Sequence, residues 1–306
     1  MSTAGSKRAV FAALIANLGI AVAKFAGFAI TGSASLLAEA VHSVADTGNQ
    51  LLLLLGIKRA KKPATTRHPF GFGRERYFWA FVVSIVLFTL GSVFAIFEGV
   101  NKLTHPHALE SPTIAIVILV IAFGLEAFSF RTARQESNTI RGTRTWPAFI
   151  RESKTPELPV LLLEDFGALL GLAIALACVL LSMATGSSSW DGLGSCLIGA
   201  LLGVFAFVLA VEMKSLLLGE AASDEDVAAI EKAIDQSPMV VSCIHLRTQH
   251  FGPDELLVGA KIEFISDLTM ASLAAAIDDV ERRIRSAVAA SCVIYLEHDI
   301  KRAEAE

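Results

Sequence analysis

The chain has 306 residues, of which 54% are hydrophobic, with a mean hydropathy of +0.59 and a formal net charge of -4. A composition this apolar excludes an ordinary soluble globular protein and indicates a chain that crosses a membrane several times. The four cysteines lie far apart and form no CxxC pair, which argues against a disulfide framework or a thiolate zinc site. The first apolar run is too long for the core of a signal peptide, so it is interpreted as the first membrane helix.

Six apolar segments are long enough to cross a bilayer as helices, which takes roughly 20 residues each. In chain order they lie at about 9–31, 34–57, 77–100, 112–132, 158–183 and 191–213. Basic residues gather in the second and fourth links between these spans, at 58–76 and 131–154, whereas the other three links contain at most one lysine. Because positively charged loops stay in the cytoplasm, both termini are expected on the cytoplasmic side. The link at 132–157 is expected to be a long polar loop, disordered in part.

After the sixth span the composition changes to that of a soluble domain. Ser223, followed by acidic residues, predicts a capped helix over 223–236. Two β-rich runs joined by Gly252, Pro253 and Asp254 predict a hairpin. A second helix is expected over 269–288 and a last strand over 293–300, which completes the order αββαβ.

The predicted fold class is therefore a membrane all-α bundle of six transmembrane helices, residues 1–215, followed by a C-terminal cytoplasmic α+β domain, residues 216–306. The order αββαβ suggests a ferredoxin-like arrangement with two helices on one sheet. Nucleic acid is not an expected partner, because the basic residues are divided between short loops and the tail is acidic.

The second span contains an unexpected polar stretch, AEAVHSVADTGNQ, at residues 38–50. Each residue of a helix turns by about 100°, so Glu39, His42 and Asp46 share one face. Charges inside a membrane are costly and persist where they are paired, hydrated or functional. His and Asp at i and i+4 can bind one divalent cation, such as zinc, cobalt, iron or manganese. Because both ligands bind metal only when deprotonated, metal entry would compete with protons.

A structural alternative explains the same stretch without metal. Glu39 and His42 would hydrogen-bond to neighbouring helices, and Asp46 would pair with a lysine, for which Lys24 in the first span is the candidate. The stripe by itself leaves both interpretations open.

The fifth span adds two adjacent acids, Glu164 and Asp165, inside an apolar run. Asp165 could supply a third ligand to the ion held by His42 and Asp46, with Glu164, Glu39 or a water as the fourth. The alternative is that this pair lies near the cytoplasmic end of the span and is simply hydrated. Three further charged residues of the spans are expected to have structural roles: Lys24, Glu98 and Glu126. Glu126 is expected to pair with Arg131 or Arg134.

Several features together resemble the cation diffusion facilitator family, the zinc-transporter family of solute carriers. They are HSVAD at 42–46, six spans with both ends inside, HPFGFGRERYFW at 68–79, and the αββαβ tail. The resemblance implies a homodimer that exports divalent cations from the cytoplasm in exchange for protons.

The resemblance also implies a transport site with two ligands from span two and two from span five, spaced as i and i+4. These positions correspond here to His42, Asp46 and Asp165, but the remaining one is Leu161, which cannot bind metal. LLLEDFGALLG looks like the family branch in which Glu-Asp replaces the usual pair, so Glu164 is the natural substitute. A site with one nitrogen and several carboxylate oxygens selects zinc less strongly than one with two histidines.

Other possible metal ligands are weaker. In the tail, His245 and Asp299 could bind metal weakly at most, and the loop at 58–76 has His68 but no aspartate. His105 and His107 are expected to lie in a solvated loop. The tail contains three histidines that do not fall convincingly on the family's metal positions: His245, His250 and His298.

Glu39 and His42 form only part of a metalloprotease HExxH motif, because residue 38 is Ala38, so an enzyme is not expected. The function predicted from the sequence is proton-coupled efflux of a divalent cation by alternating access, with zinc the first candidate and manganese, cobalt and iron the others. No prosthetic group is expected; the transported ion, protons, the lipid bilayer and a second copy of the chain are the partners. The alternative is a non-transporting membrane metal sensor or scaffold. A bacterial inner membrane is the expected location, since no eukaryotic-style targeting segment is recognised.

Overall fold

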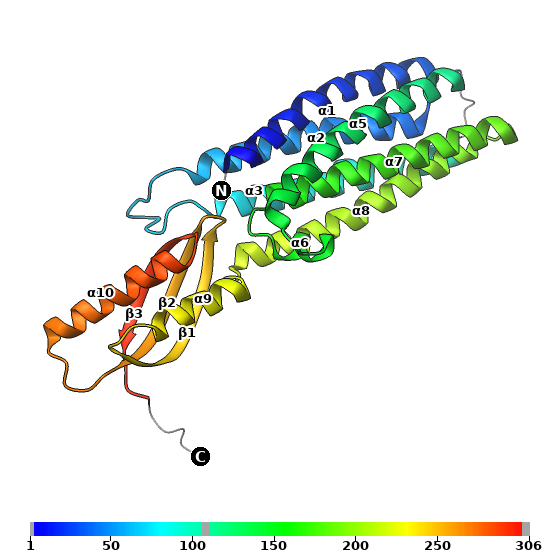
Figure 1. Cartoon of the computed structure of the whole chain (residues 1–306). Helices are drawn as coiled ribbons and strands as arrows, with labels where there is room; N and C mark the ends of the chain where they lie inside the picture. The colour runs from blue at the N-terminus through cyan, green and yellow to red at the C-terminus, as the bar shows by residue number, and fades with distance from the viewer. Residues whose placement is uncertain (1–2, 106–110, 302–306) are drawn as a thin grey trace. The chain divides into compact units, whose positions relative to one another are not determined.

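The computed structural model describes residues 3–105 and 111–301 (Figure 1). The chain divides into two compact units. One consists of Met1–Arg59 and Arg76–Lys214, and the other of Ala60–Glu75 and Ser215–Glu306.

The first unit is a bundle of long helices that run alongside one another (Figure 1). Its described helices are α1 (Thr3–Thr31), α2 (Ala34–Ala60), α3 (Glu75–Val86), which continues through the π-helix η1 (Leu87–Val93) into α4 (Phe94–Thr104), α5 (Pro112–Arg141), the short α6 (Trp146–Glu152), α7 (Glu157–Thr185) and α8 (Ser189–Leu218). Each predicted span falls inside one of these long segments. The predicted helical membrane bundle is therefore confirmed.

Four segments of the described chain are long and apolar enough to cross a membrane, namely Glu75–Thr104, Pro112–Arg141, Glu157–Thr185 and Ser189–Leu218. α1 contains a shorter apolar section, Asn17–Thr31. α2 is less apolar because it carries the polar stripe and ends in Lys58 and Arg59. Its hydropathy is thus lowered by the same residues that make it a functional candidate.

The expectation of a long, partly disordered loop at 132–157 is wrong. α5 continues to Arg141, and α6 forms within the remaining segment, where the Thr145 hydroxyl accepts a hydrogen bond from the Ala148 amide. Phe149 of α6 is fully buried and packs with Leu158 and Leu161. Aromatic residues inside a polar segment therefore anchor it, and burial of their rings offsets the entropy of ordering the chain.

Buried ionic contacts join the ends of the helices. Arg76, at the start of α3, makes a two-point contact with Glu157, at the start of α7, with Nε–Oε1 and Nη2–Oε2 distances of 2.6 and 2.7 Å. Asp191 of α8 accepts hydrogen bonds from the Ser33 hydroxyl and the Ala34 amide, both 2.8 Å long. It thereby caps α2, whose first amides have no partner within their own helix.

The second unit contains α9 (Asp224–Asp235), β1 (Val240–Gly252), β2 (Glu255–Phe264), α10 (Met270–Ala287) and β3 (Ser291–His298). The strand order is β1-β2-β3; β1 and β2 are antiparallel, whereas β2 and β3 are parallel. The predicted αββαβ tail is confirmed. Ser223 caps α9, as predicted, by accepting a hydrogen bond from the Asp226 amide at 3.1 Å.

The core of this unit lies between one face of the sheet and the two helices. Alternate residues of β2 are buried, as expected of a strand with one covered face. Ile230 of α9, Ile262 of β2 and Val280 of α10 are all 0% exposed and belong to the same apolar cluster.

The loop before α3 belongs to the second unit and packs on the β1–β2 turn. The rings of Phe70 and Phe251 have centroids 4.7 Å apart. A Cβ atom added to Gly73 would lie 2.7 Å from the carbonyl oxygen of Phe251. The glycine of the HPFGFGRER segment thus permits a close backbone approach that a larger residue would block.

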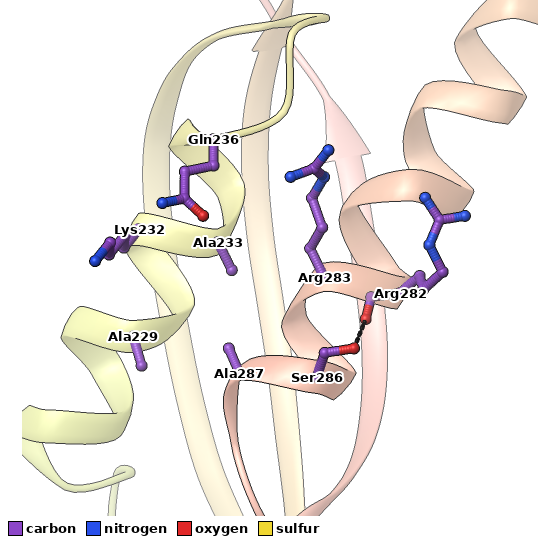
Figure 2. A pocket seen from close by; sticks show the side chains of 8 residues that line it. All are labelled: Ala229, Lys232, Ala233, Gln236, Arg282, Arg283, Ser286 and Ala287. Atoms are coloured by element: carbon purple, nitrogen blue, oxygen red, sulfur yellow. Dashed lines mark hydrogen bonds between the residues drawn. The ribbon is translucent and has the colours of Figure 1, made fainter.

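A surface hollow lies between α9 and α10 (Figure 2). Its floor is formed by small side chains, including Ala233 and Ala287, and its rim by Lys232, Arg282 and Arg283. Both arginines contact Asp279, so part of their charge is already compensated within α10.

Candidate metal-binding site

The polar stripe of α2 faces the interior of the helical unit. Glu39, His42 and Asn49 are 0% exposed and Asp46 is 2% exposed. These residues recur at helical spacing, so a single face of α2 brings them all inward. The structure therefore buries the stripe against protein.

His42 and Asp46 are brought together by this spacing. Nε2 of His42 lies 3.5 Å from Oδ2 of Asp46. In the described part of the chain, neither ring nitrogen of His42 makes a hydrogen bond, nor does Oδ1 of Asp46. Buried polar atoms are normally satisfied, and those that are not call for an explanation such as an ion. An imidazole and a carboxylate in this arrangement are suitable donors for a divalent cation.

The π-helix η1 borders the histidine. A Cβ atom added to Gly91 of η1 would lie 3.8 Å from Nδ1 of His42. π-helices are rare in proteins, and those that occur are frequently found at functional sites. The irregular turn in the third span therefore coincides with the polar stripe in the second.

Glu164 and Asp165 of α7 are each 1% exposed, so they do not lie at a hydrated surface. The side-chain amide of Asn49 donates a hydrogen bond to Oε1 of Glu164 at 2.7 Å. Ser129 of α5 donates one to Oδ2 of Asp165 at 2.9 Å. The two acids are thus oriented by different helices, and both are close enough to Asp46 for their charges to act on it.

The four predicted ligands do not all converge. Among the described residues, no group of three or more His, Cys, Asp or Glu side chains is close enough to hold a metal ion. His42 and Asp46 are adjacent, whereas Glu164 and Asp165 are hydrogen-bonded to Asn49 and Ser129. The set His42, Asp46, Asp165 and Glu164 therefore stays a prediction.

The structural alternative holds for Glu39, which is hydrogen-bonded to Lys24 of the neighbouring helix α1, but Lys24 does not pair with Asp46. Its ammonium group donates to Oε2 of Glu39 at 2.9 Å and to the Ser43 hydroxyl at 2.8 Å. It also lies 3.8 Å from Oε1 of Glu126 in α5, so the expected pairing of Glu126 with Arg131 or Arg134 is not observed. A lysine in an apolar span needs a buried counter-charge, and that signal could have directed attention to this group.

Two family models match the chain in sequence. Residues 10–218 match the cation efflux transmembrane domain, and residues 222–299 match the cytoplasmic domain of cation efflux proteins. The chain belongs to the cation diffusion facilitator family. The resemblance seen in the sequence is thereby confirmed, and the family is one of cation transporters rather than enzymes.

Relatives of this family member occur in eukaryotes and bacteria. The chain is 33% identical over 244 residues to the mitochondrial proton-coupled zinc antiporter SLC30A9 of Mus musculus, a match that covers 79% of this chain and 43% of that protein. It is 31% identical over 267 residues to metal tolerance protein C4 of Arabidopsis thaliana, covering 85% and 57%. It is 28% identical over 281 residues to the cation-efflux pump FieF of Escherichia fergusonii, covering 91% and 87%. The chain spans about half the length of these two eukaryotic relatives.

The other candidate ligands of this family member have different surroundings. Nδ1 of His250 lies 3.2 Å from the carbonyl oxygen of Gly252, and Asp299 accepts a hydrogen bond from Lys261 at 3.4 Å. The ring of His68 packs against Phe72, with centroids 4.8 Å apart. His105 lies beside the Thr104 hydroxyl, whereas His107 is outside the described residues.

Proposed function

We propose that this protein exports a divalent metal cation from the cytoplasm in exchange for protons, with zinc as the first candidate and manganese, cobalt and iron as the others. The observation that carries the proposal is the buried His42–Asp46 pair, whose donor atoms lack hydrogen bonds within the described structure, beside Glu164 and Asp165. A doubly charged ion would compensate acids that are otherwise costly in a membrane. The relatives in mouse and Escherichia fergusonii, named a proton-coupled zinc antiporter and a cation-efflux pump, support the same activity.

His42, Asp46, Asp165 and Glu164 are the proposed ligands of the transported ion. Binding requires a neutral imidazole and ionised carboxylates, so metal and protons compete for the same atoms. To bind one ion, Glu164 and Asp165 would have to turn from Asn49 and Ser129 towards the histidine. These neighbours would then act as resting partners for the two acids when no metal is bound.

The proposed assembly is a homodimer in a bacterial inner membrane with both termini in the cytoplasm. The match of residues 222–299 to a cytoplasmic domain of cation efflux proteins supports the placement of the tail. The near full-length match to bacterial pumps supports the choice of membrane. Residues 1–215 would form the transport domain and residues 216–306 the cytoplasmic domain.

Metal uptake into inside-out vesicles with an imposed pH gradient tests the proposal. We expect wild-type protein to accumulate zinc, and Asp46→Ala and Asp165→Ala each to lower uptake at least about 100-fold, since loss of an outer-shell partner alone costs roughly 10- to 100-fold in metal affinity. Glu98→Gln is the matched control, because Glu98 is a half-buried acid of α4 that takes no part in the site.

Parallel uptake of manganese, cobalt and iron identifies the preferred ion. Normal uptake by either alanine variant would refute the ligand assignment. Binding without uptake by the wild type would favour a membrane sensor or scaffold over a transporter.

A further inference from the structure

Lys24, Glu39 and Glu126 form a second charged group inside the helical unit. They belong to three different helices, α1, α2 and α5, and their side chains are at most 1% exposed. Gly171 of α7 makes room for the group, because a Cβ atom there would lie 2.4 Å from Oε1 of Glu39. The group thus occupies an interior space between four helices.

Lys24 makes a closer contact with Glu39 than with Glu126. It donates a hydrogen bond to Glu39 at 2.9 Å, whereas its nearest Glu126 oxygen is 3.8 Å away and accepts no hydrogen bond within the described structure. One ammonium and two carboxylates leave one negative charge uncompensated. An isolated buried carboxylate is so costly that it takes up a proton instead. Glu126 has the weaker contact with Lys24 and is therefore the candidate for taking up this proton.

The same face of α5 connects this group to the proposed ligands. Ser129 lies three residues after Glu126 and donates to Asp165. Lys24 of α1 and Glu39 of α2 act on Glu126, and the charge of Glu126 in turn acts on the proposed ligands. These ligands are Asp46 of α2 and Glu164 and Asp165 of α7, and the interaction between like charges is mutual. A divalent cation that neutralises the acids of the site would therefore lower the free-energy cost of a negative charge on Glu126.

We infer that Glu126 is a proton-binding site, separate from the metal ligands, that releases its proton when the cation binds and takes one up when the cation leaves. This inference rests on the proposed function and names one carrier of the exchanged proton. The step is balanced: the O–H bond of the Glu126 carboxyl breaks, its electron pair stays on the carboxylate, and the proton leaves to water. Lys24 and Glu39 remain an ion pair throughout and hold Glu126 in position.

Proton release on zinc binding tests the inference on the purified full-length protein in detergent. The released protons are counted with a pH-indicator dye in weak buffer while zinc is titrated. We expect Glu126→Gln to bind zinc and to release roughly one proton fewer per ion than wild type, because a glutamine cannot ionise. Glu126→Asp, which keeps a carboxyl, should retain the release, and Glu98→Gln should behave as wild type.

Infrared difference spectra give a second readout, and its wild-type part does not depend on the folding of a variant. Zinc binding should remove the carbonyl band of a protonated carboxyl, and Glu126→Asp should shift that band. Equal proton release by Glu126→Gln and wild type, or a wild-type spectrum without such a band, would overturn the inference while leaving metal export intact. A wild type that binds no divalent cation would overturn the proposed function and this inference together.

Discussion

Two helices of this protein carry rows of charged side chains in opposite environments. In α2 the row of Glu39, His42 and Asp46 is buried, with exposed fractions of at most 2%. In α10 Asp279 pairs with Arg283 one turn further on, at 2.6 Å, on an accessible surface. α10 compensates its own charges, whereas the stripe of α2 contains no lysine or arginine and depends on other helices or on an ion. Charges compensated within one helix suit a surface exposed to water, whereas buried charges without a partner on their own helix require one from another helix or from an ion.

Replacing Lys24 by methionine should give the largest effect on stability. It would leave Glu39 and Glu126 buried without a cation, and removal of one partner of a buried ion pair costs roughly 3–5 kcal/mol. Thermal unfolding of the detergent-solubilised protein measures the change. Glu39→Gln in the same chain should restore much of the loss, because it removes the orphaned charge.

Lys261→Met is the matched change in the second unit. Lys261 contacts Glu297 and Asp299 but its side chain is 39% exposed, so water replaces the lost contacts and the unfolding temperature should not change measurably. Equal changes of the unfolding temperature in Lys24→Met and Lys261→Met would show that buried and surface charges contribute alike, contrary to this prediction.

A substitution that disturbs close helix packing in the bundle should lower the stability by an intermediate amount. A Cβ atom on Gly99 of α4 would lie 2.7 Å from both the backbone nitrogen of Cys196 and the carbonyl oxygen of Gly192 in α8. Because backbone cannot move aside easily, Gly99→Ala should destabilise the protein by about 1–3 kcal/mol. Thermal unfolding measures it, with Gly259→Ala in β2 as control, where the nearest atom would be 3.9 Å away. Tolerance of alanine at Gly99 would show that α4 and α8 separate readily.

A small, local effect is expected from Asp279→Asn. A hydrogen bond from the Arg283 guanidinium holds the pKa of the Asp279 carboxyl below its ordinary value. A lowered pKa in the folded state gives stability that is present above the ordinary pKa of about 4 and is lost as the pH falls through the folded value.

Hydrogen exchange of α10 in the full-length protein should therefore be slightly faster in Asp279→Asn than in wild type at neutral pH. The two should converge in acid. A difference that grows as the pH falls would contradict the assigned ion pair.

Much of the fold could be predicted because its signals are local. Apolar runs of bilayer length located the long helices, and Ser223 marked the start of α9. The segment 132–157 was predicted wrongly, since its polar composition concealed Phe149, whose burial depends on Leu158 and Leu161. Polar composition predicts exposure only where no neighbouring element offers an apolar surface.

The candidate site also combines features that could be predicted from the sequence with features that could not. Helical periodicity alone was sufficient to place His42 beside Asp46, because both belong to one helix. It could not identify Asn49 and Ser129 as the partners of Glu164 and Asp165, which depend on how α2, α5 and α7 pack. The HPFGFGRER segment marked the family without revealing its contact with Phe251.

The amino-acid sequence by itself determined the helical bundle, the αββαβ tail and the polar face of α2, because hydropathy and periodicity act over neighbouring residues. The packing of the helices was needed to show that Lys24 donates a hydrogen bond to Glu39 and lies farther, at 3.8 Å, from Glu126. The physical reason is that a charge buried in a membrane takes its partner from whichever helix packs against it, and that choice is made in space rather than along the chain.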